Sequence, residues 1–277
     1  MSDGALQVYE PVANRDGWVL YYPQVADNLE RYSGGGKPNP YAESIYAKFP
    51  IGVVAQRGID KFVYLKNGAS ALSTIGTPLQ RAASLHAELD DDIVVGAASA
   101  IGAYTVTLTS TANLAAAPLS TKDGLKNGYL IVNDVDGEGQ LYQIKGHEAA
   151  SGTSNFVVTL YDPLTIALTT SSQVGLARHP ADGVIASAIY AATETSGSFV
   201  GVNLLAITAS YYFWAQYKGV FPGNANEAIV KGQAVVCGIT AAKFNAFDVT
   251  STTQYIVGTA LTPAVADTEK FMIYSPP

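Results

Sequence analysis

The stretch from Asp134 to Gly139, "DVDGEG", contains the residue types that bind calcium in proteins. A helix–loop–helix calcium site takes oxygen ligands from loop positions 1, 3 and 5, a glycine at 6 and a glutamate at 12. The first four requirements are met by Asp134, Asp136, Glu138 and Gly139. The twelfth position is Lys145, which places a positive charge where a second carboxylate has to close the coordination shell.

The segments on both sides of this stretch are typical of strands, not of helices. Residues 129–132 (YLIV) and 141–144 (LYQI) are rich in β-branched and aromatic side chains. Glycine and aspartate tolerate the positive φ that hairpin turns require. The sequence therefore predicts a β-hairpin with an acidic tip. A weak calcium contact at Asp134, Asp136 and Glu138 is the alternative.

The other patterns that would indicate catalysis or metal binding are missing from the sequence. It contains no Gly-x-Ser-x-Gly, no His-Glu-x-x-His and no Gly-x-Gly-x-x-Gly that opens a helix. The three histidines, at 86, 147 and 179, have no local metal-ligand spacing. The single cysteine, Cys237, lies in the apolar run "AVVCGI", where a small buried thiol is expected. We therefore expect no enzyme activity, no catalytic residue, no bound metal and no cofactor.

Composition narrows the possible partners. Charged residues make up 14% of the 277 residues, against about 25% in typical domains, and the net charge is −7. Nucleic acid is not an expected partner, because its binding requires a basic patch and the 16 lysines and arginines are scattered singly along the sequence. The sequence has no uninterrupted apolar stretch of about 18 residues and no secretory signal at its start. We expect no membrane partner and synthesis in a cytoplasm.

From residue 61 onward the sequence is typical of an all-β protein. Residues 104–109 (YTVTLT) alternate strictly, with Tyr104, Val106 and Leu108 on one face and threonines on the other. Regular short strands separated by turn residues predict a β-sandwich or β-barrel with little helix. The remaining expected strands are 61–65, 129–132, 141–144, 156–161, 211–220, 234–239, 254–261 and 270–274.

Residues 78–92 are the main helix candidate. They include helix formers and an apolar stripe, but the acidic run Asp90–Asp92 would lie at the helix C-terminus, where negative charge is unfavourable. We therefore favour a non-helical structure there, with the three aspartates in a solvated loop; a cation site at the three aspartates is the alternative.

The first 60 residues differ from the rest, because Gly34–Gly36 and Pro38–Pro40 interrupt any regular element. We expect an irregular N-terminal arm or lobe over 1–60, a β domain over 61–180 and a C-terminal β domain over 181–277, the last two being separate or one body. Tyrosine offers a large contact area and a hydroxyl at low entropic cost. An arm across a neighbouring subunit and a lobe packed on its own domain both stay open. The candidate partner-contact residues are Tyr21, Tyr22, Tyr32, Tyr41 and Tyr46.

Several phrases resemble a family of tailed-bacteriophage proteins, the head decoration or capsid cement proteins. They are "NGYLIVNDVDGEGQLYQIKGH" (127–147), "VTLYDPLTIAL" (158–168), "YYFWAQYKG" (211–219) and "IVGTALTPAVADTEKFMIY" (256–274). The resemblance covers residues 60–277 and implies a structural, non-enzymatic protein on the capsid surface of the virion. It also implies the major capsid protein as partner and a homotrimer. The family has no catalytic residues to transfer to this chain.

Two alternative functions remain. One is a minor tail or head-fibre protein of the virion. The other is an all-β carbohydrate-binding module, which would present an exposed aromatic side chain such as Trp214 in a groove. Its aromatic neighbours Tyr212, Phe213 and Tyr217 favour burial of Trp214 in the core instead.

Overall fold

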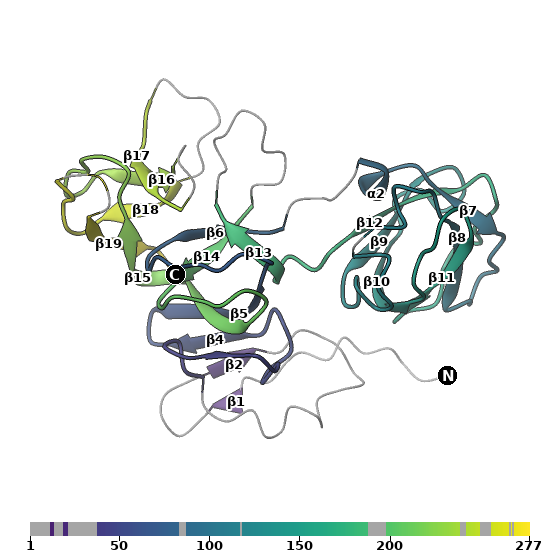
Figure 1. The fold of residues 1–277 in the computed structure, drawn as a ribbon, viewed down its shortest axis with the longest axis horizontal. Helices are drawn as coiled ribbons and strands as arrows, with labels where there is room; N and C mark the ends of the chain where they lie inside the picture. The colour runs from purple at the N-terminus through teal and green to yellow at the C-terminus, as the bar shows by residue number, and fades with distance from the viewer. Residues whose placement is uncertain are drawn as a thin grey trace. The chain divides into compact units, whose positions relative to one another are not determined.

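The fold is given by a computed structural model of residues 1–277. It describes residues 12–13, 19–21, 38–82, 87–116, 118–187, 198–238, 242–249, 256–265, 267 and 269–277. The chain divides into two compact units: unit 1 comprises Met1–Ala83 and Pro180–Pro277, and unit 2 comprises Ser84–His179 (Figure 1). Unit 2 is therefore an insertion in the sequence of unit 1.

The all-β prediction is confirmed, because nearly every regular element in the described residues is a strand. The strands of unit 1 are β1 (Val12–Ala13), β2 (Val19–Tyr21), β3 (Glu43–Ser44), β4 (Val54–Arg57), β5 (Asp60–Asn67), β6 (Pro78–Gln80), β13 (Asp182–Ala186), β14 (Phe199–Asn203), β15 (Tyr212–Asn224), β16 (Ala234–Cys237), β17 (Phe244–Ala246), β18 (Ile256–Ala260) and β19 (Lys270–Ser275). Unit 2 holds α2 (Ala87–Asp90), β7 (Ile93–Ala97), β8 (Thr105–Thr109), β9 (Tyr129–Asp134), β10 (Leu141–His147), β11 (Asn155–Leu160) and β12 (Gln173–Ala177).

Unit 2 is a closed barrel in the order β10-β11-β8-β7-β12-β9, visible on the right of Figure 1. Its strands alternate as a barrel requires, with one face of each strand turned to the interior. On β8, Val106 and Leu108 are fully buried, whereas Tyr104, just before the strand, is 52% exposed. Phe156, Val158 and Leu160 of β11 join the same core.

Unit 1 forms one sheet along the path β1-β2-β4-β5-β13-β6-β14-β15-β19-β18-β16-β17. An additional pairing of β5 with β15 closes a ring of the strands β5, β13, β6, β14 and β15. The interior of this ring contains Leu65, Leu79, Val184 and Phe213. The second half of β15 leaves the ring to pair with β19, and a separate apolar cluster packs around Phe221 and Phe271.

The long strand β15 extends from one of these cores to the other. Its first half is buried on both faces from Phe213 to Gln216, because it pairs with β5 and lies inside the molecule. Its second half, from Lys218, alternates between buried and half-buried residues. A single strand therefore contributes to both cores of unit 1.

The suggested boundary between residues 180 and 181 lies one residue from the observed end of unit 2 at His179, but the boundary at residue 60 differs from the observed units. A boundary at residue 60 falls inside the β4–β5 hairpin, where Arg57 pairs with Asp60. In addition, β2 pairs with β4, so strands from the first 60 residues are part of the unit 1 sheet. The sequence did not predict these strands, because short strands flanked by glycine and proline show no clear hydrophobic periodicity.

The helix candidate at 78–92 contains one short strand and one short helix. Residues Pro78–Gln80 form β6, which is fully buried, and the short helix α2 covers Ala87–Asp90. Strand β6 lies between β13 and β14, and this pairing overrides the local helix propensity. The aspartates at 90–92 are exposed, as predicted, although Asp90 is the last residue of α2 and only Asp91 and Asp92 follow the helix.

Candidate functional site

The segment from Pro38 to Pro50, which we call the aromatic segment, carries the largest exposed side chains near the start of the described chain. Tyr41 is 68% exposed, Ile45 56% and Tyr46 78%. Large apolar side chains that lie close together on a surface mark interaction sites more often than isolated ones do. The aromatic segment is therefore the candidate contact surface.

The aromatic segment is held in place by unit 1. Strand β3, in the middle of the segment, pairs with the start of β15. The carboxylate of Glu43 accepts two hydrogen bonds from Thr208, at 2.7 Å from its backbone N–H and 2.8 Å from its hydroxyl. These two residues lie 165 positions apart in the sequence.

The C-terminal end of the segment is anchored in the core. Phe49 is 2% exposed, and its ring packs edge-on against Tyr64 and Trp214, with centroid separations of 5.3 and 5.1 Å. The backbone N–H of Lys48 donates to the Tyr64 hydroxyl at 3.0 Å. The exposed side chains thus project from a backbone that is fixed at β3 and at Phe49.

Two local turns set the backbone on either side of β3. The N–H of Tyr41 donates to Asn39 Oδ1 at 3.0 Å, and the N–H of Tyr46 donates to Ser44 Oγ at 3.2 Å. Side-chain-to-backbone bonds over two residues of this kind stabilise turns. A backbone fixed in this way loses little conformational entropy when a partner binds.

Two of the five tyrosines proposed from the sequence are exposed in the part of the chain that the structure describes. Tyr41 and Tyr46 lie on the aromatic segment, and the sequence argument missed Ile45 between them. The side chains of Tyr21, Tyr22 and Tyr32 lie outside the described residues. Ile45 could have been found, because it directly precedes Tyr46 in a segment with few other apolar residues.

Trp214, the aromatic residue that a carbohydrate-binding module would use, is 2% exposed. It packs in the core with Phe49 and Tyr64. The prediction that Trp214 is buried is confirmed. Its side chain lines only a small pocket of about 70 Å³, together with residues of the aromatic segment, Tyr64 and Tyr212.

The predicted hairpin at the acidic stretch is confirmed, because β9 and β10 pair antiparallel with Leu141 opposite Ile131. Gly137 and Gly139 at its tip have φ angles of 88° and 84°. Glycine adopts such angles without a steric penalty, which explains why the turn contains it.

The acidic side chains at the tip are all exposed, and two of them accept hydrogen bonds, one within the turn and one from the segment before β12. Asp134 Oδ1 accepts the N–H of Val135 at 2.8 Å. Asp136 Oδ2 accepts the hydroxyl of Thr169 at 2.9 Å. Across the described part of the chain, no three His, Cys, Asp or Glu side chains are grouped so that they could hold a metal ion.

The side chains of Cys237 and His147 are both buried and take part in the packing and hydrogen bonding of the fold. Cys237 on β16 is fully buried, as predicted; burial raises the pKa of its thiol to about 12, and the Ser187 side chain lowers it to a smaller extent. His147 is 3% exposed, its Nε2 accepts the N–H of Leu125 at 2.9 Å, and its Nδ1 lies 2.6 Å from the carbonyl oxygen of Glu148. The imidazole therefore satisfies two backbone groups of the barrel.

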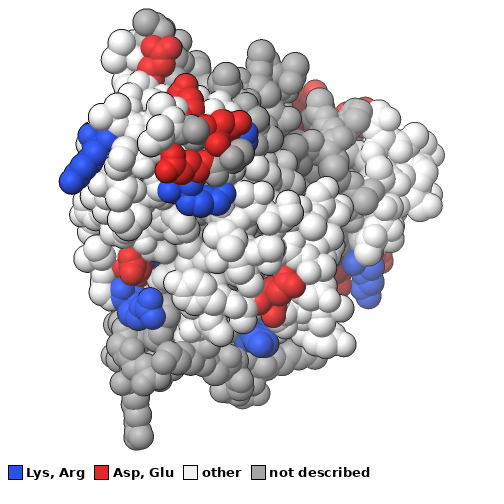
Figure 2. Space-filling model, turned by 60° about the vertical axis from the view of Figure 1, so that its left-hand side comes forward, with Lys and Arg blue, Asp and Glu red and all other residues white. Residues whose placement is uncertain are grey.

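Uncharged side chains cover most of the described surface in the view of Figure 2, and charged residues form small groups. One close pair joins Lys243 Nζ to Asp267 Oδ1 at 2.6 Å. Interfaces between proteins are poor in charged residues at their centres, because unpaired charges are costly to bury. The surface is therefore suited to contact with other protein subunits.

Within the described ranges, no helix is long and apolar enough to cross a membrane. Comparison with known proteins found no matching family model, no matching curated protein and no matching solved structure.

Proposed function

We propose that this protein is a non-enzymatic structural component of a phage virion, which decorates the assembled capsid and stabilises it by binding the major capsid protein. The observation that carries the proposal is the aromatic segment. Tyr41, Ile45 and Tyr46 are exposed on a backbone that β3 and Phe49 fix to unit 1. The resemblance of residues 60–277 to decoration proteins supports the same role.

The physical basis of the role is preferential binding to the assembled state. Any protein that binds an assembled shell more tightly than its free subunits stabilises that shell by mass action. Tyrosine side chains on a preordered backbone supply much of the binding energy in many interfaces. A homotrimer would engage the shell through three copies at once, and avidity would strengthen each modest contact.

A binding experiment with capsids that lack the protein tests the role of the aromatic segment. The double variant Tyr41→Ser/Tyr46→Ser removes both exposed rings. We expect its affinity for capsids, measured by co-sedimentation, to fall by at least about tenfold, because truncation of aromatic anchors typically costs 2 kcal/mol or more. Its melting temperature should stay close to that of the parent, since both side chains are exposed.

Tyr104→Ser is the matched control. Tyr104 is 52% exposed, but it belongs to unit 2. This variant should bind capsids as the parent does. Parental affinity of the double variant would refute the aromatic segment as the contact surface.

Electron microscopy of particles with the protein labelled tests the location. Label on the capsid shell supports the proposal, whereas label on tails or on head fibres favours the alternative virion roles. Light scattering of the purified protein tests the oligomeric state, with the mass of a trimer as the expected result. Binding on a glycan array would instead favour a carbohydrate-binding module.

A further inference from the structure

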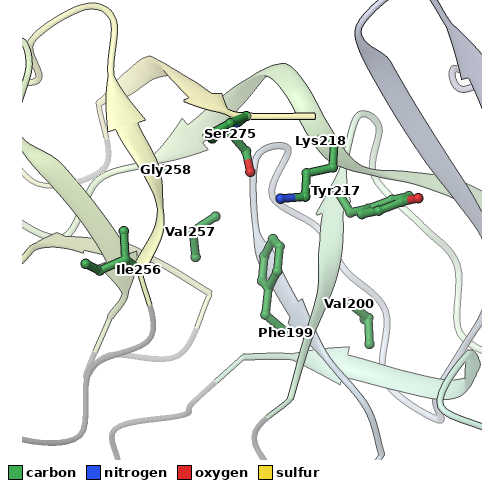
Figure 3. Close-up of a pocket in the computed structure, with 9 residues that line it drawn as sticks. Phe199, Val200, Tyr217, Lys218, Ile256, Val257, Gly258 and Ser275 are labelled. Carbon is green, nitrogen blue, oxygen red and sulfur yellow. The ribbon is translucent and has the colours of Figure 1, made fainter.

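Unit 1 contains a pocket of about 310 Å³ where β14, β15, β18 and β19 meet (Figure 3). This volume lies at the lower end of the range for small-molecule sites, and equals that of about ten water molecules at about 30 Å³ each. The pocket is lined by Phe199, Val200, Tyr217, Lys218, Ile256, Val257, Gly258, Ser275 and Pro276.

The β15 side of the pocket is shaped by a bulge. The register between β15 and β5 shifts between Gln216 and Lys218, which leaves Tyr217 as the extra residue. Bulges re-aim the side chains next to them and are enriched at binding and catalytic sites. Gly219, with a φ of 89°, follows directly and passes so close to Asp60 that a Cβ atom would clash with the carboxylate.

Buried hydrogen bonds hold this bulge in one conformation. The side-chain amide nitrogen of Gln216, a 3% exposed residue, lies 3.0 Å from Asp60 Oδ1. The same nitrogen is 3.1 Å from the carbonyl oxygens of Lys218 and Val220. Asp60 Oδ1 also accepts the N–H of Val220 at 3.1 Å. The backbone that carries Lys218 is therefore fixed before any ligand arrives.

Two polar groups point into the pocket. In Figure 3, the Lys218 ammonium and the Ser275 hydroxyl are both directed toward its centre. Ser275 is 3% exposed, and its hydroxyl makes no hydrogen bond to any described residue. Lys218 forms no ion pair with the residues that the structure describes. A hydroxyl at a pocket wall that makes no hydrogen bond to the protein can donate to a ligand or accept from one.

The rest of the wall is apolar. Phe199 lies across the pocket from the two polar groups, and Val257 and Ile256 form the side provided by β18 (Figure 3). Ile256 is 52% exposed although it is a large aliphatic residue. The pocket thus combines one cationic end with an aromatic and aliphatic body.

We propose that this pocket binds a small carboxylate that has an apolar body and about ten non-hydrogen atoms in all. The carboxylate pairs with Lys218 Nζ and accepts a hydrogen bond from Ser275 Oγ. The apolar part lies against Phe199, Val257 and Ile256. This site does not depend on the capsid role, because none of its residues belongs to the aromatic segment.

Titration calorimetry of the full chain with octanoate tests the proposal. Octanoate has an apolar chain and a carboxylate, and it matches the pocket in size. Octan-1-ol and octylamine are the matched probes, because they keep the chain and replace the carboxylate by a neutral or a cationic group. We expect octanoate to bind with a one-to-one stoichiometry and at least about tenfold more tightly than either probe, since charge-assisted hydrogen bonds are the stronger ones.

Variants assign the binding to this pocket. Lys218→Met keeps the aliphatic part of the side chain and removes the charge, and should weaken octanoate binding about tenfold. Ser275→Ala should weaken it several-fold, and Val257→Trp should abolish it by filling the pocket. Lys231→Met, an exposed lysine outside the pocket, is the control and should bind as the parent does.

Each possible result of these experiments either supports the carboxylate site or overturns it. The proposal is overturned by an absence of octanoate binding at millimolar concentration, by equal binding of octan-1-ol, or by parental affinity in Lys218→Met. If Val257→Trp does not fold, Lys218→Met and Ser275→Ala decide the question, because both change side chains without adding volume. Equal weakening by Lys218→Met and Lys231→Met would also refute the site, since it would show a general effect of net charge.

Discussion

At the scale of single residues, the buried reactive side chains serve the fold. Cys237 and His147 are the residues that a search for nucleophiles or metal ligands would select first. The thiolate, not the thiol, is the nucleophile and metal ligand, and burial keeps Cys237 in its neutral form. Both of the usable ring nitrogens of His147 face backbone groups of unit 2.

Cys237 makes the stability of the protein sensitive to alkaline pH. Its pKa is raised to about 12 from the ordinary value of 9.0, so the unfolded state releases the thiol proton at lower pH than the folded state does. The contribution is fully present below pH 9 and is lost as the pH rises toward 12. We expect the free energy of unfolding of the parent to fall in this window by up to about 1.4 kcal/mol per pH unit more than that of Cys237→Ala.

Urea unfolding at a series of pH values measures this difference. Lysine and tyrosine residues titrate in the same window, and comparison with Cys237→Ala removes their contribution. Between pH 6 and 8 the difference between the two proteins should be constant. Parallel curves from pH 9 upward would contradict the prediction.

His147 stabilises unit 2 by satisfying the Leu125 N–H. His147→Ala leaves this buried donor without its partner, and an unsatisfied buried group costs about 1–3 kcal/mol. Residues 84–179 contain no tryptophan, so tryptophan fluorescence reports unit 1. We expect the variant to shift the far-UV dichroism transition of unit 2 to lower urea concentration while the fluorescence transition stays in place. A shift of the fluorescence transition alone would be inconsistent with this role.

At the scale of elements, the β9–β10 hairpin shows how turn chemistry imitates a metal motif. Aspartate and glycine are frequent both in calcium loops and in tight turns, since both structures need positive φ angles and side-chain oxygens close to the backbone. Asp134 and Asp136 use these oxygens for Val135 and Thr169.

The stability of the hairpin should therefore not depend on calcium. We expect the parent and the variant Asp134→Asn/Asp136→Asn each to melt at the same temperature in calcium and in chelator, because asparagine keeps the accepting oxygen of each turn bond. Scanning calorimetry measures this. A calcium-dependent rise in the parent that the variant lacks would establish a metal site at the tip.

At the scale of the whole molecule, unit 2 is an insertion between two neighbouring strands. In unit 1, β6 and β13 pair antiparallel, with Gln80 opposite Ile185, and all of unit 2 lies between them in sequence. The described core of unit 2 draws on residues 89–176 alone. The apolar clusters of unit 1 contain no residue of unit 2 among those described.

Each unit should therefore fold without the other. We expect a chain in which a short Gly-Ser linker replaces residues 84–179 to unfold cooperatively, with the parental emission spectrum of buried Trp214. Residues 84–179 expressed alone should show the dichroism of a β protein and a cooperative melt. Aggregation of the linked unit 1, or a non-cooperative melt of unit 2, would show that the units stabilise each other.

Local patterns in the sequence were enough to predict β5, β8–β11, β15, β16, β18 and β19, but not the other strands, such as β7, β12 and β14. The alternation at 104–109 predicted the burial of Val106 and Leu108, because successive side chains of a strand point to opposite faces. Apolar neighbours likewise predicted that Cys237 and Trp214 are buried, and the turn residues predicted the β9–β10 hairpin.

Only the tertiary structure decided what these strands build. The pairing of β5 with β15, the bond between Glu43 and Thr208, and the meeting of Lys218 with Ser275 at one pocket all join residues that are distant in sequence. The spacing of residues along the chain determines which face of a strand a side chain occupies. It does not determine which strand lies beside it, because that depends on how the whole set of apolar faces packs together.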